Sequence, residues 1–188
     1  MKKLLLLTFA TFYSLILLAQ ADSKSNAPII PVMLPTNDIV KNISLTPNTH
    51  IFSSFIKKTD LTRTYTSRGP ITIFVPVDDG YTDLPTGKLD SLSKPAHVWD
   101  LTDLVTYHAI VGEFKLKNLR KQINKHKGTA TFTTLSGGLL TAKIDSNNNI
   151  ILIDGNGGES SISQPDITQN NGIIHVVNKV LIPKKRVI

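Results

Sequence analysis

The chain has 188 residues, of which 21 are Lys or Arg and 14 are Asp or Glu, and its formal net charge is +7. It contains no cysteine, so a disulfide-stabilised scaffold and any thiol chemistry are excluded. The length fits a single domain of about 100–200 residues, which is large enough to bury a hydrophobic core.

The first 21 residues have the layout of a secretory signal peptide. Basic residues Lys2 and Lys3 precede an uncharged, mostly apolar stretch from Leu4 to Leu18, and the small-x-small sequence Ala19-Gln20-Ala21 follows. The apolar stretch is shorter than the roughly 20 residues of a membrane-spanning helix. We therefore expect residues 1–21 to be cleaved and the chain to be exported to the periplasm, the cell surface or the medium. Residues 22–35 are polar and then proline-rich, which predicts a linker.

The first helix is expected to start at Thr46. A hydroxyl side chain followed by Pro47 is typical of a helix start, because the hydroxyl caps the first turn and proline fits the first helical position. Apolar side chains then recur at helical spacing, at Ile51, Phe52, Phe55 and Ile56. A shorter helix of one or two turns is expected from Asp78 to Leu84.

Two longer helices are expected between Pro95 and Gly128. The first carries a single apolar stripe, formed by Val98, Leu101, Leu104, Val105 and His108. The second is cationic and amphipathic, with Leu116, Leu119 and Ile123 on one face and Lys117, Lys121 and Lys125 on the opposite face. Gly128 ends the cationic helix, since glycine is the commonest residue just past a helix end.

Strand patterns dominate the rest of the chain. An early strand is predicted at Ile71–Val75, and further strands at 129–135, 139–145, 150–153 and 172–182. Asparagine-rich residues 146–149 and glycine-rich residues 154–158 predict the turns between them. Because helices dominate the first half of the chain and strands the second, the sequence predicts an α+β fold.

Several short segments occur in an order that resembles the fasciclin domain family. They are Thr72-Ile-Phe-Val-Pro76, Tyr107-His108-Ala-Ile-Val-Gly112, Thr134-Leu135 with Leu140-Thr141, and Asn171-Gly-Ile-Ile-His175 continuing to Leu181-Ile-Pro183. The resemblance covers residues 36–183 and leaves 184–188 as a basic tail. It implies an antiparallel β-wedge flanked by helices, and a role in extracellular adhesion by binding proteins, matrix or polysaccharide. Val75 stands where the family usually has alanine, and Gly80-Tyr81 where it has Ala-Phe.

The resemblance also implies candidate partner-binding residues. In animal members, residues around a Tyr-His pair and a Pro-Asp-Ile segment are linked to integrin binding, and the matching positions here are Tyr107, His108, Asp166 and Ile167. The bacterial type of signal peptide argues against integrin as the natural partner. A structural role competes with partner contact, because a histidine at a helix C-terminus can bond the open carbonyl groups and suits the helix dipole.

The cationic helix is a second candidate surface. Removal of Lys2 and Lys3 with the signal peptide lowers the net charge from +7 to +5, and the remaining excess is local. The candidate polyanion-binding residues are Lys117, Arg120, Lys121 and Lys125, with acidic polysaccharide or, peripherally, anionic lipid headgroups as partners. Nucleic acid is not expected, because the chain is predicted to be exported and few aromatic residues lie among the basic ones. The alternative is a solvated face that keeps the protein soluble.

Catalytic and metal motifs are missing from the sequence. There is no Gly-x-Ser-x-Gly elbow, no glycine-rich phosphate loop and no zinc spacing of histidines. Asp145-x-Asn147-x-Asn149 begins like a calcium loop, but Ile150 and Asn156 stand where glycine and glutamate are needed. We therefore expect no enzyme activity, no metal and no cofactor.

Two functions remain open on the sequence. The leading hypothesis is an exported adhesion module that binds an extracellular or envelope protein or polysaccharide. The alternative is a carrier of a small apolar ligand, such as a lipid or pigment, in a pocket lined by Phe52, Phe55 and Ile56. An unrecognised hydrolase that uses Ser136 or His108 is a third option, and the oligomeric state is left open.

Overall fold

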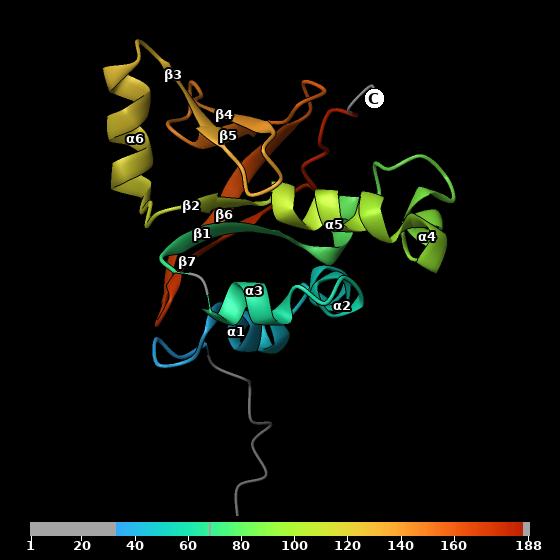
Figure 1. Ribbon diagram of the computed structural model, residues 1–188. Helices are drawn as coiled ribbons and strands as arrows, with labels where there is room; N and C mark the ends of the chain where they lie inside the picture. The colour runs from blue at the N-terminus through green and yellow to red at the C-terminus, as the bar shows by residue number, and fades with distance from the viewer. Residues whose placement is uncertain (1–32, 68, 186–188) are drawn as a thin grey trace, which may run out of the picture. The chain divides into compact units, whose positions relative to one another are not determined.

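The structure is a computed structural model that describes residues 33–67 and 69–185 (Figure 1). The predicted signal peptide, residues 1–21, and most of the predicted linker lie outside the described residues. Within the described part of the chain, no helix has both the length and the apolar character needed to cross a membrane.

Helices fill the first half of the described chain and strands the second, so the predicted α+β class is confirmed. The helices are α1 Ile39–Leu45, α2 His50–Lys58, α3 Thr62–Ser67, α4 Lys88–Leu92, α5 Val98–Tyr107 and α6 Leu116–Lys125, with 3-10 turns η1 Asp78–Tyr81 and η2 Pro95–His97. The strands are β1 Ile71–Pro76, β2 Ala109–Val111, β3 Thr129–Thr133, β4 Leu139–Ile144, β5 Ile150–Ile153, β6 Glu159–Gln169 and β7 Gly172–Val177.

The strands form one seven-stranded sheet in the order β2-β1-β7-β6-β5-β4-β3. Neighbouring strands are antiparallel with one exception, the pair β1 and β7, which is parallel with Ile71 opposite Gly172. Both strands of this parallel pair are buried on both faces, as is usual for parallel strands. The expected antiparallel wedge therefore contains one parallel pair, formed by the second and third strands of the sheet.

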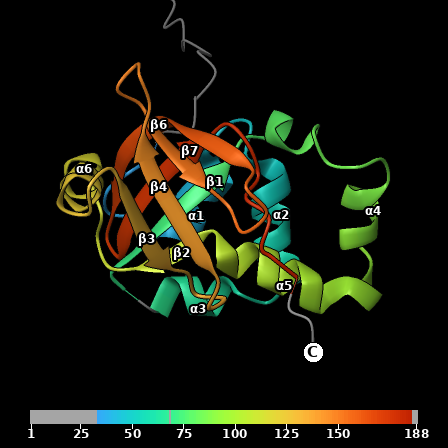
Figure 2. The same ribbon diagram turned by 90° about the horizontal axis from the view of Figure 1, so that it is seen from above.

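The two ends of the sheet meet. Ile110 of β2 forms a bridge with Thr134 just after β3, and the Leu135 N–H donates to the Ala109 carbonyl at 2.7 Å. Viewed from above, β3, β4 and β6 lie in front with no helix over them (Figure 2). This bridge and this hydrogen bond bring the two edge strands β2 and β3 together.

Two hydrophobic clusters stabilise the fold. The first packs α1, α2 and α5 against one face of β1 and β7, and includes Phe52, Phe55 and Tyr65. The buried Tyr65 hydroxyl donates to the Val105 carbonyl at 3.0 Å. The second lies between α6 and the inner face of β3, β4 and β5. Each buried large apolar side chain contributes roughly 1.5–3 kcal/mol relative to an exposed one.

The predicted helix start at Thr46 is wrong. A helix that the sequence analysis did not predict, α1, precedes it and is capped by Asp38, whose carboxylate accepts from the Lys41 N–H at 2.8 Å. Thr46 ends that helix instead, since its hydroxyl donates to the Asn42 carbonyl at 2.8 Å. The next helix starts at His50, after Asn48 has turned the chain with a φ of 60°.

Strand β6 was also not predicted. Its eleven residues are mostly polar and include Pro165, and its apolar residues do not alternate. Hydrogen bonds to β5 on one side and β7 on the other hold it in the sheet. The register shifts between Ile162 and Ile167, and Asp166 there has a φ of 62°. Such a bulge leaves a residue unpaired, and this accommodates a proline within the sheet.

We predict that Gly172→Ala destabilises the fold by more than about 3 kcal/mol. A Cβ at this position would overlap the backbone carbonyl oxygen of Ile71, and backbone in the parallel pair of β1 and β7 cannot move away without breaking the sheet. Gly157→Ala is the matched control: its φ of 84° causes strain, but open space surrounds the position, so a loss of about 1 kcal/mol is expected. Urea unfolding of both variants measures the difference, and equal losses would contradict the prediction.

Candidate interaction surface

Helix α6 presents a row of lysines to solvent. Its apolar residues Leu119 and Ile123 are buried in the second hydrophobic cluster, whereas Lys117, Lys121 and Lys125 are exposed. We call these three residues the lysine row. None of them forms an ion pair with any residue that the structure describes. Like charges four residues apart on a helix destabilise it by about 0.2–0.5 kcal/mol per pair, so the row opposes the stability of its own helix.

The N-terminus of α6 is held by β6. The carboxylate of Asp166, at the bulge, accepts a hydrogen bond from the backbone N–H of Leu116 at 2.6 Å. Leu116 is the first residue of α6, and a carboxylate there also interacts favourably with the positive end of the helix dipole. Asp166, a candidate partner-binding residue, therefore caps the cationic helix from another element.

His175 on β7 completes the attachment of α6. Its Nε2 donates to the Phe114 carbonyl at 2.7 Å, and its Nδ1 accepts from the Asp166 N–H at 3.2 Å. The ring stacks on Phe74 with centroids 5.6 Å apart and has no exposed surface. Burial lowers the pKa of His175, and one ring nitrogen must accept, so the imidazole is neutral. His175 is therefore a hydrogen-bonded residue of the sheet.

Arg120 is engaged differently from the lysine row. Its guanidinium donates to the side-chain oxygen of Asn148 at 2.6 Å and to the Asn148 backbone carbonyl. Asn148 lies in the turn between β4 and β5, so Arg120 ties α6 to that turn. In the same turn, the Asp145 carboxylate accepts from the backbone N–H groups of Asn147 and Asn149 at 2.9 and 2.7 Å. The oxygens that resembled a calcium loop are thus used to form the hairpin.

Tyr107 and His108 lie at the C-terminal end of α5 and are 1% and 0% exposed. His108 Nδ1 donates to the Leu104 carbonyl at 2.8 Å, and its Nε2 accepts from the Leu181 N–H at 3.0 Å. The Tyr107 hydroxyl donates to the Leu139 carbonyl at 2.6 Å. The pair therefore joins the end of α5 to the C-terminal segment and to the start of β4.

The four residues carried over from the family resemblance do not gather into one exposed patch. Tyr107 and His108 are buried, Ile167 is half-buried against the first hydrophobic cluster, and Asp166 is exposed but bonded to α6. A contact between any of these four residues and a partner stays a prediction.

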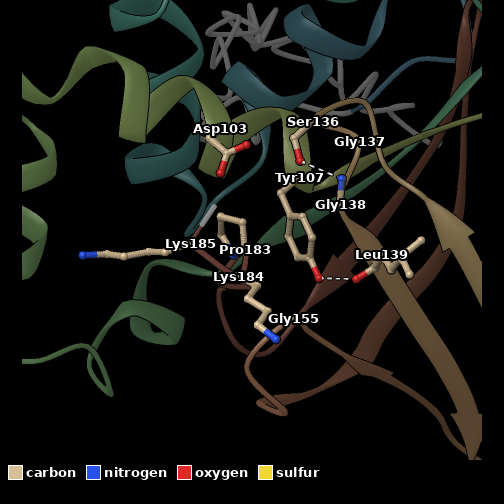
Figure 3. A pocket seen from close by; sticks show the side chains of 10 residues that line it. All are labelled: Asp103, Tyr107, Ser136, Gly137, Gly138, Leu139, Gly155, Pro183, Lys184 and Lys185. Carbon is tan, nitrogen blue, oxygen red and sulfur yellow. Dashed lines mark hydrogen bonds between the residues drawn. The ribbon is translucent and has the colours of Figure 1, made fainter. Parts of the chain in front are cut away.

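A cleft of about 400 Å³ opens beside the end of α5 (Figure 3). Its lining comes from α5, the β3–β4 turn, the β5–β6 turn and the C-terminal segment, and consists of Asp103, Tyr107, Ser136, Gly137, Gly138, Leu139, Gly155, Pro183, Lys184 and Lys185. Burial, together with the charges of Asp154 and Asp103, raises the pKa of Tyr107 to about 12, so its hydroxyl stays protonated and donates. The cleft therefore offers a neutral phenol, a carboxylate and two ammonium groups.

Sequence analysis did not single out this cleft. Its lining residues come from four segments far apart in the chain, which only the closed sheet brings together. One signal was present: Trp99, Asp103 and Tyr107 are spaced four residues apart, so they lie along one side of α5.

Ser136 and His108, the residues of the hydrolase option, do not form a nucleophile–base pair with each other. The Ser136 hydroxyl lies 3.1 Å from the Thr134 hydroxyl, and both ring nitrogens of His108 are bonded to backbone. The Asp78 carboxylate accepts from the Ile51 N–H at 2.8 Å and so caps α2. No group of three His, Asp or Glu side chains in residues 33–67 and 69–185 is arranged to hold a metal ion.

The side chains proposed to line an apolar pocket are core residues. Phe52, Phe55 and Ile56 are at most 1% exposed and pack in the first hydrophobic cluster. The cleft at α5 is lined by other residues, as is a smaller cleft of about 200 Å³ beside Asp83 and Lys179.

We predict that the free energy of unfolding falls by up to about 3 kcal/mol as the pH drops from 6.5 to 4, because of His108. Burial lowers the pKa of His108 to about 4, from an ordinary value of 6.5. In this window the unfolded chain binds a proton that the folded chain does not, so stability is fully present above pH 6.5 and is lost toward pH 4. Urea unfolding of the wild type and His108→Asn between pH 7 and 4.5 should show their difference shrinking. An NMR titration of the His108 ring with a midpoint near 6.5 would contradict this prediction.

We predict that Asp166→Ala destabilises the protein by about 1–2 kcal/mol and speeds amide exchange at Leu116, because the cap of α6 is lost. Asp166→Asn is the control, since asparagine keeps an acceptor and tolerates the φ of 62°. Its loss should be well under 1 kcal/mol. Unchanged Leu116 exchange in the alanine variant would show that Asp166 does not hold the helix.

Comparisons with known proteins agree with this structure. A family model described as Fasciclin domain matches residues 47–183. Protein sll1483 of Synechocystis sp. is 22% identical over 178 residues, which cover 93% of this chain and 91% of that protein. Periostin of Homo sapiens is 29% identical over 115 residues, which cover 61% of this chain and 12% of periostin.

A solved structure has the same fold. A FAS1 domain pair from the insect cell adhesion molecule fasciclin I matches 79% of this chain and 51% of its own with a TM-score of 0.67, at 20% sequence identity. The family model spans well over half of the 188 residues. The chain therefore belongs to the fasciclin domain family.

Proposed function

We propose that this protein is an exported, non-catalytic interaction module that binds an acidic polysaccharide of the cell envelope or matrix through the lysine row of α6. The observation that carries the proposal is the row itself: Lys117, Lys121 and Lys125 are exposed, lie on one face of a firmly attached helix, and have no ion-pair partner among the described residues. The signal-peptide pattern supports export to the periplasm, the cell surface or the medium.

The spacing of the row suits a linear polyanion. Neighbouring lysines are four residues apart, so about 6 Å of helix rise separates one ammonium-bearing position from the next. Each charge near an anionic surface contributes about 1 kcal/mol, and several such contacts along one chain add to a useful affinity. The helix carrying the row is fixed at one end by Asp166 and near its middle by Arg120, so little order has to be created on binding.

A polysaccharide fits this surface better than a lipid bilayer does. The apolar residues Leu119 and Ile123 of α6 face the core, so the helix has no apolar side to insert between lipid chains. Anionic headgroups would therefore be contacted only peripherally. A protein partner with an acidic surface is the other outcome that the same charges allow, and adhesion by a related domain in fasciclin I supports an interaction role in general.

Catalysis is not part of the proposal. An enzyme needs a nucleophile or base held by an orienting partner. The buried histidines His108 and His175 use both ring nitrogens in structural hydrogen bonds. His50 and His97 pair with Asp78 and Asp100, and neither pair lines one of the two clefts. Carriage of an apolar ligand has no support from the placement of Phe52, Phe55 and Ile56 in the core.

We predict that the triple variant Lys117→Glu, Lys121→Glu, Lys125→Glu weakens binding to immobilised polygalacturonate at low salt by at least about tenfold. Three attractive charges become repulsive, and the loss should shrink as added salt screens the charges. The measurement is the dissociation constant by surface plasmon resonance across a range of sodium chloride concentrations.

The matched control reverses three exposed lysines elsewhere, Lys41, Lys57 and Lys58, and so produces the same change in net charge. Its affinity should fall by less than about threefold, since only the long-range charge changes. Equal losses in the two triple variants would show that net charge alone, and not the lysine row, is responsible.

A further inference from the structure

Trp99 is 82% exposed, the highest value among the exposed large apolar side chains of the described residues. It is also the only tryptophan in the chain. It stands in the first turn of α5, a helix whose opposite side is buried through Leu101, Leu104 and Val105. Burial of a tryptophan side chain is worth several kcal/mol, so an aromatic ring left in water on a rigid helix is available to a ligand.

Trp99 lies on the same side of α5 as the two residues of that helix that line the cleft. Asp103 follows Trp99 by one helical turn and Tyr107 by two, and both line the cleft. The distance along the helix from Trp99 to Tyr107 is about 12 Å, because each residue adds about 1.5 Å. Trp99 lies outside the lining of the cleft, and Asp103 stands between it and Tyr107 along the same side of α5.

The cleft is formed before any ligand arrives. Its C-terminal wall is held by the Asp154 carboxylate, which accepts from the Ile182 N–H at 2.9 Å, and by the Asn156 amide, which donates to the Ile182 and Pro183 carbonyls at 3.2 and 3.3 Å. On the other wall, Gly138 lies so close to the Tyr107 ring that a Cβ would come within 2.8 Å of it. Pre-formed walls reduce the entropy lost on binding.

The charges at the cleft are unpaired within the described chain. Lys184 and Lys185 are exposed, and neither they nor Asp103 form an ion pair with a described residue. Figure 3 shows the Asp103 carboxylate near Pro183 and the Lys185 side chain extending away from Tyr107. The cleft can therefore accept hydrogen bonds at Asp103 and attract an anion to the two lysines.

We propose that Trp99 and this cleft form a saccharide-binding site that takes a short stretch of an acidic oligosaccharide, about two or three rings long. The apolar face of one sugar ring stacks on Trp99, a hydroxyl group of the next ring donates to Asp103, and a sugar carboxylate meets Lys184 and Lys185. The α5 site is separate from the lysine row, because α6, which carries the row, lies at the left of both views and α5 lies to its right (Figures 1 and 2). The inference rests on the proposed polysaccharide partner. It adds a site that would recognise the sugar rings as well as the charge of that partner.

A saccharide fits the α5 site better than a protein partner. A stable protein interface buries about 800 Å² on each side and has an apolar core. The residues close to Trp99 in the chain include Lys94, His97 and Asp100, and Leu139 is the exposed apolar residue at the cleft. An isolated aromatic ring among polar groups suits a ligand that has both an apolar face and many hydroxyl groups.

Tryptophan fluorescence tests the α5 site directly, because all tryptophan emission comes from Trp99. Titration of the protein with hexagalacturonate should shift the emission to shorter wavelength and saturate, while neutral maltohexaose should bind at least about tenfold more weakly. Isothermal titration calorimetry should show Trp99→Ala and the double variant Lys184→Gln, Lys185→Gln each losing about tenfold or more in affinity. Val111→Ala, at a 69% exposed apolar residue elsewhere, is the control and should bind like the wild type.

The outcomes separate the two proposals. Saturating hexagalacturonate without a change in Trp99 emission, or an unchanged affinity in Trp99→Ala, would overturn the α5 site even if polygalacturonate binding still depends on the lysine row. Binding that is insensitive to the lysine row, with the fluorescence change intact, would overturn the function proposed for α6 and leave the α5 site standing. Trp99-dependent binding of a purified envelope protein with no oligosaccharide binding would assign this face to a protein and also overturn the proposal.

Discussion

The parallel pairing of β1 with β7 is the constraint on which the rest of the structure depends. Both strands are buried on both faces, and Gly172 allows the backbone of β7 to approach Ile71 where a side chain would overlap it. Ile71 and Gly172 lie far apart in the chain, and their strands are paired side by side. The chain between β1 and β7, which includes β2, the cationic helix and β3–β6, therefore forms one long connection that starts and ends at this pair. The first hydrophobic cluster covers one face of the pair and links it to the N-terminal helices.

The same strand pair positions the segment before α6 through Thr72 and the neutral His175. Thr72 of β1 donates to the Gly112 carbonyl at 2.7 Å and accepts from the Phe114 N–H at 2.9 Å, while His175 of β7 donates to the Phe114 carbonyl. The segment that enters α6 is therefore attached to both β1 and β7. His108, at the C-terminal end of α5, accepts from the Leu181 N–H and so holds the C-terminal segment, which forms one wall of the cleft at α5. Rigid attachment makes both surfaces available without a conformational change.

Local patterns in the sequence predicted the elements that bury a regular apolar face. The apolar runs of β1 and β7 and the amphipathic pattern of α6 were found because burial and helical or strand periodicity coincide there. Strand β6 was missed because its place depends on hydrogen bonds to two neighbours rather than on apolar residues, and Thr46 was assigned to the wrong helix because a hydroxyl serves either end. The roles of Asp166 and Trp99 depend on segments that meet only in the folded chain, which spacing along one sequence does not reveal.

The domain carries Lys117, Lys121 and Lys125 on a firmly attached helix, and these three cations have no ion-pair partner among residues 33–67 and 69–185. The central claim is that these cations bind a polyanion. The salt dependence of the binding constant tests this claim most directly, because it reports how many counterions are released on binding. The logarithm of the association constant for polygalacturonate, plotted against the logarithm of the salt concentration, should fall with a slope between about −2 and −3, as expected when about three lysines displace bound counterions. A slope near zero, or no binding at low salt, would contradict the claim.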